Sequence, residues 1–185
     1  MSQDIKVNLD VIEMMLFYWE SVASKDKMSD EYFMEIANKE EMKVLYKDGF
    51  SPDSVRRVLS CISNREKLNN TSKEESKFWS QNMRMVEDLR LLHSMIEPVK
   101  HLNLSTLKEK LSNKSDIEVI FLPFPDGDYI VCENKIYFNF FGIIAKYQMQ
   151  AEELEVQDDA MLKVDVSFHG MSIKQYVESV IEKNY

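Results

Sequence analysis

Residues 117–141 read IEVIFLPFPDGDYIVCENKIYFNFF, and they form the one stretch of this 185-residue chain that does not fit a helical pattern. The stretch is dense in β-branched and aromatic residues, which favour strands, and it contains two prolines and an Asp-Gly-Asp turn. Residues 129–132 and 135–141 flank Glu133-Asn134, a connection that suits a tight hairpin because Asn tolerates positive φ. The stretch therefore predicts a small, mostly antiparallel sheet.

Apolar residues recur at helical spacing before this stretch. Ile12, Leu16 and Trp19 predict a first helix over about 9–24. Ser51-Pro52 predicts the start of another, because a hydroxyl at the cap and a proline at the first helical position suit amides that have no partner there.

Two further helices are predicted later in the bundle and after the sheet. A long helix over about 74–97 is expected to end at Pro98, whose ring and missing amide disrupt helical hydrogen bonding. A final helix is expected after Ser172, which has capping-box spacing to Gln175.

These elements predict an α+β protein in which a helical N-terminal bundle packs on a small sheet and a C-terminal helix follows. The length suits a single domain of residues 1–185. Within it, about 5–112 is expected to be the helical part and about 113–185 the sheet with the C-terminal helix.

The charge of the chain restricts its partners. A net charge of −9 and a pI near 4.9 repel phosphate backbones and anionic membranes, so no nucleic-acid partner is expected. No stretch approaches the roughly 18 apolar residues of a membrane span, and no secretory leader is visible, so we expect a cytoplasmic protein. Cys61 and Cys132 lack metal or redox spacing and are expected to be small buried hydrophobes.

One group of residues has spacing that suits a metal. His93 and Glu97 lie four apart on the predicted long helix, and His101 follows after four more. Pro98 should break the helix before His101, which favours an ordinary polar pair over a zinc site. No metal or other cofactor is therefore expected.

Other candidate constellations favour structural roles as well. Asp126-Gly127-Asp128 resembles the centre of a calcium loop but lacks the further alternating ligands, so a turn is favoured. His169 ends a predicted strand, where catalytic residues occur, but no nucleophile elbow accompanies it. The aromatic row of 137–141 is expected to be core.

An acidic run in the second half of the chain is the candidate partner-binding site. It is interpreted as a solvated face that can dock on a basic protein surface. Its members are Glu152, Glu153, Glu155, Asp158 and Asp159.

Several short segments, taken together, make the chain resemble bacterial zinc-dependent peptidases. They are 28–33 (MSDEYF), 42–46 (MKVLY), 121–123 (FLP) and 135–139 (KIYFN), in that order. The resemblance implies a helix carrying His-Glu-x-x-His, whose histidines bind zinc and whose Glu activates water. This chain lacks the motif, and residues 181–185 (IEKNY) at the matching place keep only Glu182. The resemblance therefore implies a truncated or inactive relative.

Taken together, these observations predict a non-enzymatic protein that binds another protein. Two alternatives stay open. One is a metal-dependent hydrolase or peptidase that uses an unrecognised site among His93, Glu97, His101 and His169. The other is a small-molecule or peptide pocket lined by Met and aromatic residues between the helices and the sheet.

Overall fold

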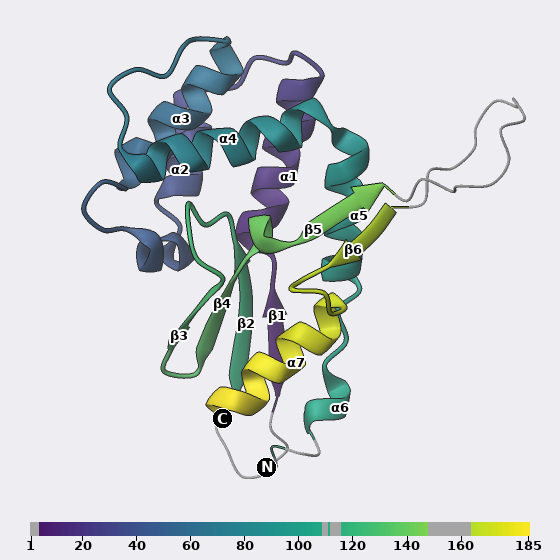
Figure 1. The fold of residues 1–185 in the computed structure, drawn as a ribbon. Helices are drawn as coiled ribbons and strands as arrows, with labels where there is room; N and C mark the ends of the chain where they lie inside the picture. Colours follow the sequence, from purple (N-terminus) through teal and green to yellow (C-terminus); the bar gives the residue numbers. More distant parts are fainter. Residues whose placement is uncertain (1–3, 109–110, 112–115, 148–163) are drawn as a thin grey trace, which may run out of the picture.

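In the chain's computed structural model, which describes residues 4–108, 111, 116–147 and 164–185, the helices of residues 10–87 gather at one end, and the main sheet lies at the other end with the C-terminal helix across it (Figure 1). This arrangement confirms the predicted α+β class. The helices are α1 (Asp10–Ala23), α2 (Asp30–Ala37), α3 (Pro52–Asn64), α4 (Lys73–Glu87), α5 (Leu89–Lys100), α6 (Ser105–Lys108) and α7 (Ile173–Asn184), with 3-10 turns η1 (Glu40–Leu45) and η2 (Phe140–Gly142). The strands are β1 (Ile5–Asn8), β2 (Ile117–Leu122), β3 (Tyr129–Cys132), β4 (Lys135–Asn139), β5 (Ile144–Tyr147) and β6 (Val164–Ser167).

The predicted serine caps are present. The Ser51 hydroxyl accepts a hydrogen bond from the Ser54 amide, with Pro52 in the first turn of α3. At the start of α7, the Ser172 hydroxyl accepts a hydrogen bond from the Gln175 amide, and the Gln175 side-chain oxygen accepts one from the Ser172 amide. Local chemistry alone sets these helix starts.

The single long helix predicted over 74–97 is instead two helices. Asp88 leaves the helical conformation, and its carboxylate accepts a hydrogen bond from the Leu91 amide at 3.0 Å, which caps α5. Pro98 does not end α5, which continues to Lys100. Pro98 removes only the one hydrogen bond that its own amide would donate to the Ser94 carbonyl, and the helical turn continues past it, where the His101 amide donates to the Glu97 carbonyl at 3.2 Å.

The main sheet has four strands in the order β1-β2-β4-β3. β1 and β4 both run parallel to β2, whereas β3 is antiparallel to β4. The sheet is therefore mixed rather than mostly antiparallel, although the predicted β3–β4 hairpin is confirmed. Its left-handed turn residue is Glu133, with φ 54°, rather than Asn134. The Tyr185 hydroxyl donates to the Glu133 carbonyl and holds this turn.

A second ribbon of two antiparallel strands, β5 and β6, lies apart from the main sheet. The strand predicted to end near His169 is thus present as β6. β1 was not predicted at all. It pairs Ile5 with Ile117, a contact that local pattern does not reveal.

The core connects the sheet to helices on both of its sides. Figure 1 shows α7 lying across the front of the sheet, where the rings of Tyr176 and Phe138 pack edge to face at 6.0 Å. Trp19 of α1 stacks on Phe140 at 5.6 Å and donates to the Asn82 side chain at 2.8 Å. The aromatic row of 137–141 is buried, as predicted. Among the helices that the structure describes, none has the length and apolarity to cross a bilayer.

Candidate functional site

Of the three candidate metal ligands, the structure separates His93 from Glu97 and His101. His93 points to α1, where its Nε2 lies 2.7 Å from Glu20 Oε1. His101 turns back on its own helix, with Nδ1 3.2 Å from Glu97 Oε1 and 3.0 Å from the Glu97 carbonyl oxygen. In 4–108, 111, 116–147 and 164–185, no cluster of three or more His, Cys, Asp or Glu side chains could hold a metal ion.

His169 is part of a contact between loops. Its Nε2 lies 3.0 Å from Asp128 Oδ2, and its ring lies 5.4 Å from that of Tyr176. Ser172, three residues on, uses its hydroxyl to cap α7. The geometry therefore provides a polar contact between the β2–β3 loop and the β6–α7 turn.

The carboxylates of the Asp126-Gly127-Asp128 turn point to different neighbours. Lys77 Nζ of α4 lies 2.8 Å from Asp126 Oδ1, and this hydrogen bond lowers the pKa of Asp126. Asp128 pairs with His169. Gly127 has φ +91°, so the segment is a turn, and it is held by the Lys77–Asp126 ion pair and the contact between Asp128 and His169.

The remaining predicted site residues do not form a described site. The acidic run of Glu152, Glu153, Glu155, Asp158 and Asp159 lies outside the described residues. The expectation that both cysteines are buried is wrong, because Cys61 is partly exposed and Cys132 is exposed. Cys132 is the last residue of β3, an edge strand.

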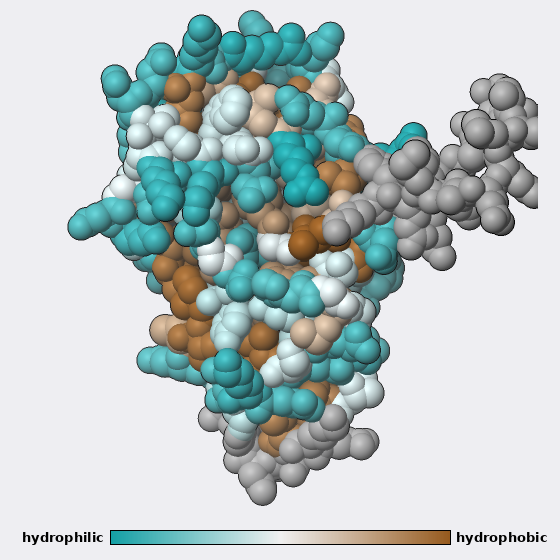
Figure 2. Space-filling model, in the orientation of Figure 1, coloured by the Kyte–Doolittle hydropathy of each residue, from teal (hydrophilic) through white to brown (hydrophobic). Residues whose placement is uncertain are grey.

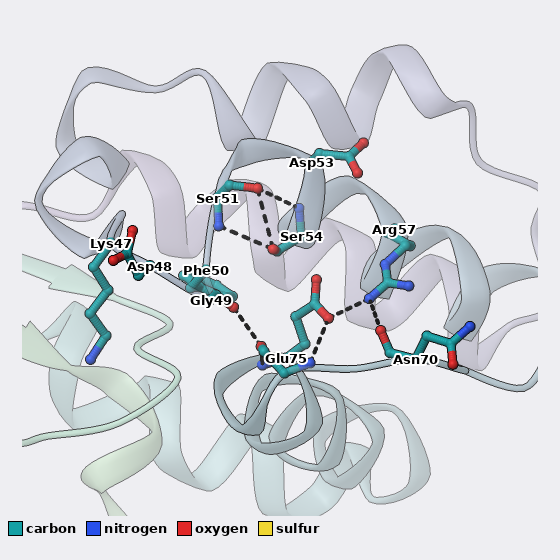
Figure 3. A pocket seen from close by; sticks show the side chains of 11 residues that line it. Lys47, Asp48, Gly49, Phe50, Ser51, Asp53, Ser54, Arg57, Asn70 and Glu75 are labelled. Carbon is teal, nitrogen blue, oxygen red and sulfur yellow. Dashed lines mark hydrogen bonds and ion pairs between the residues drawn. The ribbon is translucent and has the colours of Figure 1, made fainter.

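An open groove of about 660 Å³ lies where the N-termini of α3 and α4 meet (Figure 3). Arg57 donates to the carbonyls of Asn69 and Asn70 and forms an ion pair with Glu75, which is only 7% exposed. The Glu75 carboxylate also accepts from the Ser72 amide at 3.0 Å. These polar groups are hydrogen-bonded to one another, and the bonds hold the 65–72 loop in place.

A polar network ties β1 to its neighbours. The Asn8 side chain donates to Glu118 Oε1 at 2.9 Å and to Glu41 Oε1 at 3.3 Å, and Lys135 Nζ lies 3.3 Å from Glu118 Oε2. Burial raises the pKa of Glu118, but hydrogen bonds from Asn8 and Lys135 outweigh it, so the pKa is lowered. Sequence reasoning missed this network, since its members are far apart in the chain.

The free edge of β3 is the feature that looks most like a binding site. In the described part of the chain, β3 pairs with β4 alone, and Figure 1 shows it on the outer side of the sheet. Val131 is 38% exposed, and hydrophobic residues gather over this side of the molecule (Figure 2). The sequence signal was the uncharged run YIVC between Asp128 and Glu133.

No model of a known protein family matches the chain, and neither does any curated protein or any solved structure. The resemblance to zinc-dependent peptidases stays a prediction.

Proposed function

We propose that this chain is a non-enzymatic protein-binding protein, and that an extended segment of a basic partner adds as a strand to the free edge of β3. The observation that carries the proposal is this edge, an apolar strand with one neighbour in the described residues.

The backbone of β3 has hydrogen-bonding groups on the open side. The Asn139 amide donates to the Asp128 carbonyl at 2.9 Å, which places the polar backbone groups of Asp128 toward β4. Because these directions alternate in an antiparallel pair, Ile130 and Cys132 also face β4. The N–H and C=O groups of Tyr129 and Val131 face outward, where an added strand would bond them.

The edge lacks the features that usually prevent strand addition. Natural edge strands carry Lys, Pro, bulges or inward charges that oppose pairing with another chain. β3 reads Tyr-Ile-Val-Cys and has none of these. β1, at the opposite edge, has the exposed Lys6 at its second position. The β3 edge is therefore better suited than the β1 edge to accept an added strand.

The charges at the ends of β3 favour a basic partner over a second copy. Antiparallel self-pairing centred on residues 129–132 would place Asp128 of one copy opposite Glu133 of the other. Like charges directly opposite each other destabilise a strand pair. A segment with Lys or Arg at both ends would instead complement Asp128 and Glu133. The acidic run at 152–159 has the same charge preference and, in this proposal, adds to the attraction.

The test compares wild-type protein with Val131→Lys and Val131→Thr as bait in an extract of the native organism. Wild type and Val131→Thr, which keeps a β-branched side chain, should each retain one basic protein at about equal molar amount. Val131→Lys should lose it, because a charge on the edge opposes pairing. Retention of the same protein by all three baits contradicts strand addition at β3.

Sedimentation velocity separates the proposed partner from a second copy. The purified wild-type chain and Val131→Lys should sediment alike. A wild-type dimer that Val131→Lys converts to a monomer would show that β3 pairs with itself, and the basic partner would then be the wrong assignment.

A further inference from the structure

Helices α1 and α2 lie side by side on another part of the molecule and are rich in acidic residues, of which Asp30 is paired with Arg56 of α3. Neither helix contains Lys or Arg. The two helices contact each other, and Phe17 of α1 meets Tyr32 of α2 across the seam between them. Their acidic residues are Asp10, Glu13, Glu20, Asp30, Glu31 and Glu35.

Phe17 stands out on this surface. It is 57% exposed, the largest value among the exposed large hydrophobic residues of the described chain. Its ring lies 5.7 Å from that of Tyr32 in an edge-to-face contact. The Tyr32 hydroxyl donates to the Met14 carbonyl oxygen at 2.9 Å, which fixes Tyr32 against α1. An exposed aromatic ring is thus held in place by a second, anchored one.

Carboxylates surround these rings. Glu13 and Glu20 lie four residues before and three after Phe17, so they share its face of α1. Burial, and then the charge of Glu35, raises the pKa of Tyr32, so Glu35 lies near that ring. We call this surface the acidic aromatic patch: Glu13, Met14, Phe17, Glu20, Tyr32 and Glu35.

We infer that the acidic aromatic patch binds a basic amphipathic helix of a partner protein. Aromatic residues at the centre of a polar rim are the usual anchors of protein interfaces. The spacing also suits a helix, because Glu13 and Glu20 are seven residues apart, or about 10 Å along the axis. A partner helix lying along α1 can place Lys or Arg opposite each carboxylate and an apolar side chain between them on Phe17.

The contact and the exposure of Glu20 are compatible with a basic partner helix. One carboxylate oxygen of Glu20 is 2.7 Å from His93 Nε2, and the side chain is 44% exposed. The contact with His93 thus orients the Glu20 side chain, which stays accessible to a partner. A polyanion such as nucleic acid is excluded at this surface by the same charges.

The test uses two synthetic peptides of about 14 residues, roughly four helical turns, with the same Leu pattern. One has Lys and the other Glu at the flanking positions. Binding is followed by fluorescence anisotropy at low salt. The Lys peptide should bind the wild-type chain, and Phe17→Ala and Glu13→Gln/Glu20→Gln should each weaken it about tenfold. The Glu peptide should not bind.

A matched control separates the patch from general attraction to an acidic protein. Glu66→Gln/Asp165→Asn removes the same two charges at exposed positions on other elements and should leave affinity unchanged. Equal loss in both charge variants, or full affinity in Phe17→Ala, overturns the inference. Val131→Lys should also bind the Lys peptide normally, so the outcome is independent of the proposal for β3. Thermal unfolding checks that each variant is folded.

Discussion

Glu118 shows how single residues stabilise this fold. It lies in β2, where Asn8 donates to one of its oxygens and Lys135 to the other. By strand register it faces Lys6 on one side and Lys135 on the other. Its carboxylate is therefore stabilised in the charged form despite partial burial.

The lowered pKa of Glu118 predicts a dependence of stability on pH. Its folded pKa lies below the unfolded value, so its contribution is present above the ordinary value of 4.5 and is lost as pH falls through the folded pKa. Glu118→Gln should be less stable than wild type near neutral pH. The difference should shrink between about pH 5 and about pH 3. Urea unfolding at several pH values measures it, and a constant difference across that range contradicts the assignment.

The contacts of His93, Glu97 and His101 show why the partners of polar side chains were hard to predict from the sequence. The sequence suggested Glu97 as the partner of His93, since they are four apart on one helix. In the structure, His93 contacts Glu20 of α1, whereas Glu97 contacts His101. Spacing within a helix shows which side chains can meet, but packing between helices decides which do.

At the scale of elements, cap signals were predicted correctly, but the break at Asp88 inside the predicted 74–97 helix and the pairings between distant strands were not. The caps at Ser51 and Ser172 depend on neighbours three residues away, and both are confirmed. The direction of β2 relative to β4, and the existence of β1, depend on residues far apart in sequence. Phe17 was missed for another reason. It lies off the apolar stripe of α1, and an exposed residue leaves no periodic signal.

Helix α7 gives a prediction at this scale, because it covers the sheet and contacts the β3–β4 turn through Tyr185. Ser172→Ala removes the cap and should lower the free energy of unfolding by about 1 kcal/mol. Ser172→Asp keeps an acceptor at the cap and should stay close to wild type. Urea denaturation compares the three proteins. Equal stability of Ser172→Ala and wild type would mean that the cap bond contributes nothing to docking of α7.

For the whole molecule, acidic charge and exposed apolar groups occur together on two surfaces. The β3 edge has Val131 between Asp128 and Glu133, and the acidic aromatic patch has Phe17 between Glu13 and Glu20. In the two binding modes that we propose, an apolar contact supplies affinity, and the carboxylates around it select cationic partners. The net charge of −9 extends this selection beyond contact distance.

This division of roles predicts how binding of the basic partner proposed for β3 depends on salt. Long-range attraction speeds encounter and is screened by salt, whereas strand hydrogen bonds and apolar contacts act after contact. Raising NaCl from about 50 to about 500 mM should therefore lower the association rate by about tenfold or more and change the dissociation rate much less. Surface plasmon resonance with the purified partner measures both rates. Glu133→Gln should lower the association rate at low salt and approach wild type at high salt. A salt effect confined to dissociation would instead mean that the charges act only within the bound complex, and that the acidic field does not guide the partner to the edge of β3.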